Sequence, residues 1–364
     1  MMRITIFAGG LYTTLSARTL PLAEFLQKRY NITTEIITPI PWNFIAKGKI
    51  GNILSVILTY RIQEYIKVAT KSSDIVMIRR TANTQTYIFQ KTLKERGLRV
   101  LFDIDDALFL PSSNIFGIRI RPGTFFLEKI LRNSDYVLTN GHFLLNYVRE
   151  FNKNSCIIHD PIDTELFSPE KKIRNAKKIV IGWQGNARIH RRNLAMLINP
   201  LKRIGKEYRN IKFKIVSYLG DESITRMFSP LEKYMEIDYG TKNWVPLRSF
   251  AKMIYDFDIL VAPLEDTPWN RGKSALRVGI GMALGIPVVA SPVGEQKYVV
   301  RHGVNGFLAR NEEEWYTYLK MLIEDEHLRK KMGKEGRKIA ENELSLEVNG
   351  KKLYEIIKRA LEMK

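Results

Sequence analysis

The chain has little cysteine and no long uninterrupted apolar segment. Its 364 residues include a single cysteine, Cys156, which excludes an internal disulfide framework and suits a reducing compartment. The longest apolar stretch, residues 50–62, is interrupted by polar residues such as Asn52 and Arg61, so it is too short and too polar to span a bilayer. The N-terminal residues MMRITIFAGG lead directly into a predicted strand, so no signal peptide is expected. We therefore expect a cytoplasmic protein.

Acidic residues are scarce relative to basic ones. The 58 Lys and Arg against 38 Asp and Glu give a net charge of +20, which favours an anionic partner such as a membrane surface, a nucleotide or a nucleic acid. A charged surface of the thermophile type would produce the same composition. Nucleic acid is not an expected partner, because no recognised nucleic-acid motif is present and the basic residues are scattered along the chain.

Two widespread phosphate-binding motifs are also missing. No GxxxxGK[ST] loop exists, because no glycine lies five residues before Gly272. Gly9 and Gly10 follow the first predicted strand, but they are not part of a GxGxxG fingerprint. An anionic ligand, if there is one, must therefore be held by other means.

What the sequence does contain is an alternation of strand and helix patterns in two successive series. Short apolar runs with β-branched residues are each followed by segments of helical periodicity, which predicts parallel sheets with right-handed crossovers. The predicted fold class is α/β, with two Rossmann-like doubly wound domains that face each other across a cleft. The predicted strands are RITIFAGG, TTEIIT, SDIVMIRR, RVLFDIDD, DYVLT and SCII in the first series, and KIVIGWQGN, FKIVSYLGD, MEIDYG, DILVAPL and IPVVASP in the second.

A segment with two prolines and a basic run, residues 161–178, separates the two series and predicts the domain boundary. We expect an N-terminal domain over residues 1–165 and a C-terminal domain over residues 166–345. The amphipathic end of the chain, residues 346–364, is predicted to be a helix that crosses back onto the N-terminal domain.

Three carboxylates lie at the end of a predicted strand, in the run VLFDIDDALFLP. In doubly wound folds, ligands bind beyond the carboxyl ends of the strands, so Asp103, Asp105 and Asp106 are candidates for a catalytic site. Two alternative roles stay open for these side chains. Asp103 and Asp105 could hold Mg²⁺ or Mn²⁺, or Asp103 and Asp106 could accept hydrogen bonds from backbone N–H groups of the loop.

The loop NRGKS, which precedes a predicted helix at about Ser274, combines two cations with a helix N-terminus. Unpaired N–H groups, the positive end of the helix dipole, and the side chains of Arg271 and Lys273 together suit a diphosphate. The alternative is a solvated basic loop that caps a structural helix.

A second candidate is the segment IGWQGNARIHRRNL. Gly185 ends a strand and allows a ligand to approach the backbone closely. Arg188 and the basic residues that follow it could reach the same diphosphate. The alternative is a basic surface without a ligand.

These motifs together resemble those of retaining nucleotide-sugar glycosyltransferases with the GT-B fold, of the kind grouped as family 4 (glycosyltransferases group 1). In the second half, the matching segments are IGWQGN, PLEDTPWNRGKS, MALGIPVVASPVGE, HGVNGFLARNEEEW and LRKKMGKEGRKIAE. In the first half, FDIDDALF and HDPIDTELFSP resemble a subgroup with a DIDD motif.

The resemblance implies that the chain moves a sugar from a nucleotide-diphosphate donor to an acceptor hydroxyl, without a metal or other cofactor. Asp105 and Asp106 occupy the positions of a His-Asp pair found in many relatives, which implies that they face the reacting centre. The implied donor contacts are Gly9, Gly10, Gly185, Asn186, Arg188, Arg271, Lys273, Ser274 and Trp244.

The sequence departs from the family pattern at two acidic positions. Relatives carry Glu, seven residues and a second Glu before the MALGIP segment, and the second Glu often holds the donor ribose; here these positions are Gly272 and Ile280. The Asn that usually precedes Pro-Ile-Asp is Asp160. A sugar-nucleotide-binding protein with impaired catalysis is therefore the alternative function, and a nucleic-acid-binding or nucleic-acid-modifying protein is a weaker one.

The expected acceptor is a surface glycan or a lipid-linked glycan. Residues 41–67 interleave aromatic, aliphatic and basic side chains, which fits contact with the inner, anionic face of a membrane as well as an ordinary core helix with a basic outer side.

Overall fold

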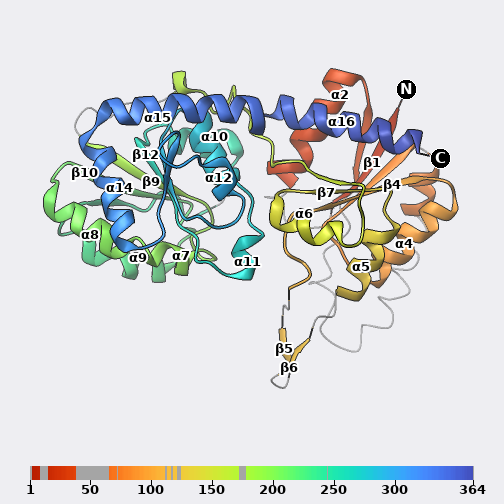
Figure 1. Ribbon diagram of the computed structural model, residues 1–364, viewed down its shortest axis with the longest axis horizontal. Helices are drawn as coiled ribbons and strands as arrows, with labels where there is room; N and C mark the ends of the chain where they lie inside the picture. The colour runs from red at the N-terminus through yellow and green to blue at the C-terminus, as the bar shows by residue number, and fades with distance from the viewer. Residues whose placement is uncertain are drawn as a thin grey trace. The chain divides into compact units, whose positions relative to one another are not determined.

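The chain folds into two compact units, each built on its own six-stranded sheet (Figure 1). The computed structural model describes residues 2–8, 15–37, 65–71, 73–110, 113–115, 118–120, 124–171, 178–243 and 245–363. Unit 1 comprises Met1–Pro161 and Asn349–Lys364, and unit 2 comprises Ile162–Val348.

The sheet of unit 1 is parallel throughout, as the alternating pattern predicts. Its strands run in the order β2-β1-β3-β4-β7-β8. Their bounds are β1 (Arg3–Ala8), β2 (Thr33–Ile37), β3 (Ile75–Arg79), β4 (Arg99–Ile104), β7 (Tyr136–Thr139) and β8 (Ser155–Ile157). The remaining elements are η1 (Leu15–Thr19), α2 (Leu20–Tyr30), α4 (Thr84–Glu95), the hairpin β5 (Ser113–Ile115) and β6 (Ile118–Ile120), α5 (Thr124–Asn133), α6 (His142–Arg149) and α16 (Leu346–Glu362).

The central strands of unit 1 are buried along their whole length, because helices cover both faces of a parallel sheet. The last helix completes this cover. Gly350 of α16 lies so close to Phe25 of α2 that a Cβ atom would stand 2.2 Å from the phenyl ring. One turn later, Tyr354 stacks on Tyr30 with ring centroids 3.7 Å apart. The C-terminal segment is thus an integral part of the core of unit 1.

The sheet of unit 2 is also parallel, in the order β11-β10-β9-β12-β13-β14. Its strands are β9 (Ile179–Gln184), β10 (Ile211–Val216), β11 (Glu236–Asp238), β12 (Ile259–Ala262), β13 (Val288–Ala290) and β14 (Gly306–Leu308). Its helices are η3 (Pro169–Lys171), α7 (Arg191–Ala195), α8 (Ile198–Glu207), α9 (Glu222–Phe228), η4 (Ser229–Leu231), α10 (Leu247–Ile254), α11 (Pro268–Arg271), α12 (Leu276–Ala283), α13 (Gln296–Val299), α14 (Glu312–Glu324), α15 (Glu326–Ile339) and η5 (Ala340–Leu344).

Strand β9 shows how the sequence builds the two cores of unit 2. Side chains alternate across a strand, so Ile181 and Trp183 pack into the core on one face, and Val180 into the core on the other. Gly182 also faces the second core, where a Cβ atom would stand 2.1 Å from the ring of Phe257. The glycine is therefore required by the close approach of that ring.

The strand orders place a ligand site in each unit. Counted along the chain, the strands of unit 2 lie in the Rossmann order 3-2-1-4-5-6, and the connections diverge between β9 and β12. In unit 1 the corresponding point lies between β1 and β3. In such sheets a ligand binds at the carboxyl ends of the two diverging strands. Within the described ranges, every helix falls short of the length and apolar character needed to cross a bilayer.

Candidate functional site

The loop after β9 closes against the first turn of α12 through Gly185 and Arg277. Gly185 has a φ of +137°, and a Cβ atom there would stand 2.8 Å from Nη2 of Arg277. Arg277 donates from Nε to the carbonyl of Gln184 at 2.6 Å, and its guanidinium lies over the ring of Trp183, 4.9 Å from the centroid. A side chain at position 185 would displace this guanidinium, so the position of Arg277 requires a glycine at 185.

Arg277 carries a charge that the described part of unit 2 does not neutralise. Its side chain is half-buried, and burial lowers its pKa to about 10. No carboxylate lies within ion-pair distance of it in the ranges that the structure describes. Its helix has no acidic residue in its first turn and no side-chain cap at Ala275. A cation opposes the helix dipole there, at a typical cost of about 0.3–1 kcal/mol, and a bound anion would relieve that cost.

His190 adds a neutral donor to the same place. Its Nδ1 accepts a hydrogen bond from Nδ2 of Asn193 at 2.8 Å, which leaves the proton on Nε2. Burial, together with the nearby charges of Arg277 and Lys273, lowers its pKa to about 2. The imidazole is therefore uncharged near neutral pH and can donate a hydrogen bond from Nε2.

Lys273 and Ser274 precede α12, which begins at Leu276, two residues later than the sequence predicts. The Nζ atom of Lys273 lies 4.7 Å from the ring centroid of Trp269. Its carbonyl accepts a hydrogen bond from the backbone of Glu295 at 2.9 Å, and Gly294 permits this packing, because a Cβ there would stand 2.9 Å from that carbonyl. We call Gly185, His190, Lys273 and Arg277 the cationic turn.

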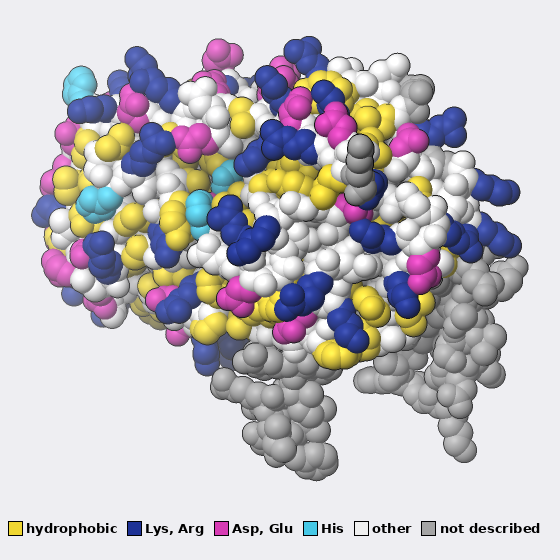
Figure 2. All heavy atoms as spheres, turned by 45° about the vertical axis from the view of Figure 1, so that its right-hand side comes forward, with side chains coloured by type: hydrophobic (Ala, Val, Ile, Leu, Met, Phe, Trp, Pro, Cys, Tyr) yellow, Lys and Arg dark blue, Asp and Glu magenta, His cyan; other side chains and the backbone are white. Residues whose placement is uncertain are grey.

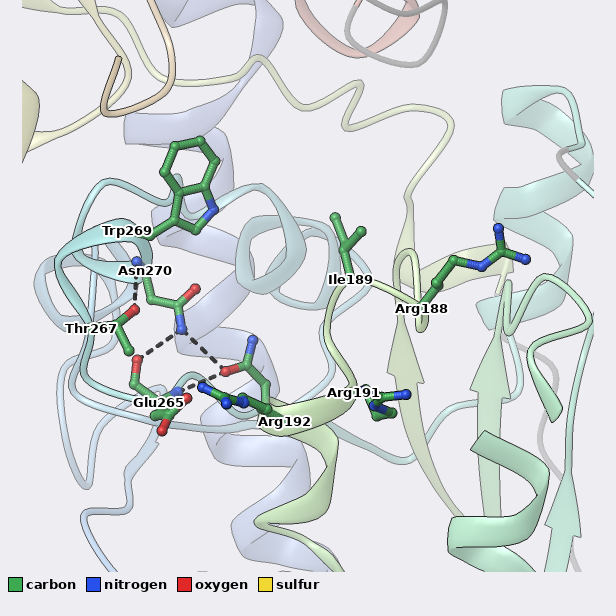
Figure 3. A pocket seen from close by; sticks show the side chains of 9 residues that line it. Arg188, Ile189, Arg191, Arg192, Glu265, Thr267, Trp269 and Asn270 are labelled. Carbon is green, nitrogen blue, oxygen red and sulfur yellow. Dashed lines mark hydrogen bonds between the residues drawn. The ribbon is translucent and has the colours of Figure 1, made fainter. Parts of the chain in front are cut away.

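Next to the cationic turn lies a pocket of about 330 Å³, between the loops that follow β9 and β12 (Figure 3). Its floor is a hydrogen-bonded pair of buried asparagines, Asn193 and Asn270. We call it the arginine pocket; it is lined by Arg188, Ile189, Arg191, Arg192, Asn193, Glu265, Thr267, Trp269 and Asn270.

The predicted donor residues divide into three groups. Gly185, Lys273 and Ser274 lie at or beside the cationic turn, and Asn186 folds the same loop by accepting a hydrogen bond from the backbone of Ile189. Arg188 and Arg271 are more exposed and already face carboxylates: Arg188 lies 3.7 Å from Asp221, and Arg271 makes a two-pronged pair with Asp266 at 2.7 and 3.1 Å. The third group, Gly9, Gly10 and Trp244, lies outside the described residues, as does most of segment 41–67.

The donor contacts predicted from the sequence include neither Arg277 nor His190. Arg277 follows Lys273 by four residues, and this i,i+4 spacing of two cations across a helix start was the available signal. The contribution of His190 depends on its burial, which the sequence does not reveal.

In unit 1, the three aspartates of the DIDD run lie in a cluster of ion pairs. Asp103 is held by Arg18 through two hydrogen bonds of 2.8 and 2.9 Å, and Arg79 approaches it at 3.2 Å. Burial alone would raise the pKa of Asp103, but Arg18 and Arg79 outweigh it and hold that pKa below its usual value. The partners found for Asp103 are thus guanidinium groups, in place of the loop N–H groups considered from the sequence. Arg18 also donates to Asp160, at 3.2 Å.

The two predicted catalytic carboxylates are buried in the same cluster. Oδ2 of Asp105 accepts from Nη2 of Arg79 at 2.5 Å, whereas its Oδ1 has no hydrogen-bond donor among the described residues. Arg80, which has a φ of +65°, reaches Asp106 through Nη2 and lies 3.6 Å from Oδ1 of Asp105. The left-handed backbone of Arg80 thus aims a cation at both carboxylates.

The metal alternative gains no support from this geometry. No group of three or more His, Cys, Asp or Glu side chains gathers as metal ligands in the part of the chain that the structure describes. The carboxylates of Asp103 and Asp105 are occupied by guanidinium groups.

Comparison with known proteins agrees with the resemblance predicted from the sequence. A curated protein described as an uncharacterized glycosyltransferase of Methanocaldococcus jannaschii is 25% identical over 243 residues, which span 65% of this chain and 61% of the relative. The chain therefore matches less than two thirds of that relative's length.

Solved structures share the fold over the full chain. A glycosyltransferase from Rickettsia africae aligns with a TM-score of 0.73 and 15% identity, over 100% of this chain and 99% of that one. Alr3699/HepE of Anabaena, solved with UDP and glucose, aligns with a TM-score of 0.68 and 14% identity, over 98% of this chain and 100% of that one. The predicted GT-B fold class is confirmed.

The family comparison locates the match in unit 2. Residues 178–325 fit the family model described as glycosyl transferases group 1, and this range contains both the cationic turn and the arginine pocket. The part of unit 2 that contains the candidate site is therefore the part of the chain that is similar to this family.

Proposed function

We propose that the protein is a glycosyltransferase whose unit 2 binds a nucleotide-diphosphate sugar at the cationic turn. The observation that carries this proposal is Arg277, a guanidinium without a carboxylate partner among the described residues, at a helix start and at the strand divergence where such folds bind ligands. The Anabaena relative was solved with UDP and glucose, which supports the same ligand class here.

Each group has a proposed role in releasing the nucleoside diphosphate. Lys273 and Arg277 neutralise the charge that develops on the leaving oxygen, which removes the need for a metal. His190 donates a hydrogen bond to the diphosphate, and the backbone at Gly185, Asn186 and Ser274 lines its path. Arg188 and Arg271 are proposed as outer cations with smaller effects, and Gly9, Gly10 and Trp244 remain proposed contacts.

Asp105 and Asp106 are the proposed acceptor-side residues of unit 1. The proposal is supported by the different surroundings of the two carboxylate oxygens of Asp105. Oδ2 accepts a hydrogen bond from Arg79, whereas Oδ1 has no hydrogen-bond donor among the described residues. Because Oδ1 is buried with Nε of Arg80 3.6 Å away, an acceptor hydroxyl can donate to it, and so be oriented for attack, once the side chain of Arg80 moves aside. Arg79 then holds the carboxylate in place.

The finer features of the reaction are proposed from the family resemblance. We propose that the configuration at the anomeric carbon is retained and that the acceptor is a surface or lipid-linked glycan. The anomeric proton coupling of the first product formed, followed by NMR, distinguishes retention from inversion.

A donor-binding protein without transferase activity is the second candidate, and one observation favours it. Ile280, at the position of the family's second Glu, is buried in an apolar core of unit 2, so no carboxylate stands at that point. Recognition of the donor ribose by a glutamate at this position is therefore absent.

A thermal-shift screen of UDP, GDP, ADP, dTDP and their sugar conjugates tests donor binding. A ligand that binds only the folded state stabilises it by about 2.7 kcal/mol at a hundred times its Kd. We expect one nucleotide series to raise Tm, and no response from any series would contradict the proposal. Release of free sugar or glycoside from the responding donor then separates a transferase from a binding protein.

We also propose that unit 1 contacts an anionic membrane surface. Phe125 of α5 is 59% exposed with Lys129 4.0 Å from its ring centroid, and Ile88 of the adjacent α4 is 51% exposed. Apolar side chains flanked by lysine suit the interface of an anionic bilayer. Figure 2 shows Lys and Arg side chains spread over the visible face without a single stripe, which fits diffuse attraction better than duplex binding.

Vesicle sedimentation tests this surface. We expect binding to phosphatidylglycerol vesicles but not to phosphatidylcholine vesicles, with a clear loss for Phe125→Asp. Val304→Asp, at a 49% exposed apolar residue of unit 2, is the matched control. Equal losses for the two variants would assign the binding to overall charge alone.

A further inference from the structure

The arginine pocket is a preformed cavity that shares only Arg188 with the proposed donor contacts. Its floor is fixed by hydrogen bonds: Oδ1 of Asn193 accepts from the backbone of Glu265 at 2.9 Å and from Nδ2 of Asn270 at 3.2 Å. Nδ2 of Asn270 also donates to the carbonyl of Glu265 at 2.9 Å. These bonds bind the loop after β12 to the start of α7, so the pocket has its shape before any ligand arrives.

The walls of the pocket combine cations with apolar surface. Trp269 is 46% exposed and Ile189 is 69% exposed, and both rise from the rim in Figure 3. Three arginines, Arg188, Arg191 and Arg192, line the pocket together with the single carboxylate of Glu265. The guanidinium of Arg188 lies 3.7 Å from Asp221 and that of Arg191 donates to Ser223 at 3.3 Å, so Arg192 is the arginine beside Glu265 in Figure 3.

This combination selects a particular ligand chemistry. A bare inorganic anion needs the arginines but gains nothing from an exposed indole and an aliphatic side chain. A pyranose ring has an apolar face that stacks on an indole and hydroxyl groups that donate to a carboxylate such as Glu265. A carboxylate or phosphate on that ring would pair with guanidinium groups in two-pronged fashion.

We propose that the arginine pocket binds an acidic saccharide unit, a sugar that carries a carboxylate or phosphate group. The inference rests on the proposed function and deepens it, because it names the class of sugar handled beside the donor site. Trp269 connects the two places: its ring belongs to the pocket wall, and Nζ of Lys273 from the cationic turn lies 4.7 Å from its centroid. A sugar stacked on Trp269 is thereby adjacent to the leaving diphosphate.

Binding of small acidic sugars to the full chain tests the proposal in the absence of nucleotide. The probes are trigalacturonate and glucose 1-phosphate, with maltotriose as the neutral comparison, titrated by calorimetry at near-physiological salt. We expect at least one acidic probe to bind about tenfold more tightly than maltotriose, because it adds a charge-assisted contact with a guanidinium group. If neither acidic probe binds more tightly than maltotriose, the proposal is wrong.

Matched variants separate the pocket from the general positive charge of the chain. Arg192→Ala and Trp269→Ala should each weaken the acidic probe about fivefold or more, because one removes a charge-assisted contact and the other the stacking surface. Arg209→Ala removes the same charge from an exposed site outside the pocket and should change the affinity less than twofold. Equal losses for Arg192→Ala and Arg209→Ala would overturn the proposal.

Competition decides where the acidic sugar comes from. If it belongs to the acceptor, the probe binds equally well with saturating UDP-glucuronate and with saturating UDP. If it is the sugar of the donor itself, UDP-glucuronate displaces the probe and UDP does not. Failure of the nucleotide screen would count against the proposed function, whereas failure of the nucleotide-free titration counts against the arginine pocket alone.

Discussion

The carboxyl edges of the two sheets use charge in opposite ways. At the edge of unit 1, the buried guanidinium groups of Arg18 and Arg79 face the carboxylates of Asp103 and Asp105 at 2.5–3.2 Å. At the edge of unit 2, Arg277 donates to a backbone carbonyl, and no carboxylate is within ion-pair distance among the described residues. The buried guanidinium groups at the carboxyl edge of unit 1 are thus paired with carboxylates, whereas Arg277 at the edge of unit 2 has no such partner among the described residues.

The difference indicates which of the two sheet edges is suited to bind an anion. Buried charges that are paired and hydrogen-bonded hold their loops in place, and removing one partner leaves the other charge buried and unpaired. A half-buried cation at a helix start carries a desolvation cost without a compensating pair, and a ligand can supply that pair. We therefore propose that the charges at the edge of unit 1 serve mainly stability and that the edge of unit 2 binds the diphosphate.

The largest effect is expected from disrupting the buried ion pairs at the edge of unit 1. Asp103→Asn leaves the buried Arg18 without its bidentate partner and should lower the stability of unit 1 by about 3–5 kcal/mol. Hydrogen exchange at the amides of β4 reports this loss locally. Asp266→Asn, which breaks an exposed pair in unit 2, should cost less than about 1 kcal/mol. Similar small losses at both sites would remove the distinction between the edges.

The next largest effect is expected at the cationic turn, where substitutions should weaken nucleotide binding. Arg277→Met and Lys273→Met should each weaken the responding nucleoside diphosphate about 10- to 100-fold, since each removes a charge-assisted contact of about 1.5–3 kcal/mol. For Arg277→Met, stability should fall by no more than about 1.5 kcal/mol, because the hydrogen bond to the carbonyl of Gln184 is lost but no carboxylate loses its partner. Calorimetric titration and thermal melting of the same samples measure both quantities. A destabilised variant with unchanged affinity would reverse the assignment.

A pH-dependent effect of intermediate size is expected from His190. Its pKa is about 2 in the folded chain and near 6.5 when unfolded, so the unfolded state binds the extra proton between these values. Stability is therefore complete above pH 6.5 and falls as the pH drops, by up to about 1.4 kcal/mol per pH unit from this group.

The variant His190→Gln isolates this contribution. His159 in unit 1, whose pKa burial and nearby cations lower to about 4, acts in the same direction in both proteins. The difference in melting temperature between variant and wild type should shrink as the pH falls from 6.5 to 4.5. If the difference in melting temperature stays constant over this pH range, His190 is not buried in its neutral form.

The smallest effects are expected at the outer cations. Arg188→Met and Arg271→Met should each change nucleotide affinity less than about fivefold, because exposed and already paired charges contribute about 1 kcal/mol or less. The same titration measures them beside Lys273→Met. Losses as large as that of Lys273→Met would extend the cationic turn outward to these residues.

The sequence predicted the elements of the fold well, because apolar periodicity and Gly-Pro punctuation report directly on buried strands and helices. The predicted strands of both series are present, and α4 begins after the N-cap Asn83, whose side chain accepts from the backbone of Thr86 at 2.9 Å. Strand β14 was not predicted, because its three residues, Gly306–Leu308, are too few to show alternation.

The charge arrangement of the site was harder to predict, because it depends on which strands are neighbours. Arg79 and Asp103 are partners in the parallel register of β3 and β4, so the RR that ends one strand faces the DIDD that ends the next. The sequence contained both runs but not their adjacency. The role of Arg277 was hidden for a similar reason, since only the fold shows that it lies beside Gly185 and away from carboxylates.

The most direct test of the account is a crystal structure of the chain with the nucleoside diphosphate that raises its melting temperature most. The account predicts that the terminal phosphate lies within hydrogen-bond distance of Lys273 and Arg277, with the backbone at Gly185 alongside. A phosphate bound elsewhere, with Arg277 still donating only to the carbonyl of Gln184, would contradict it.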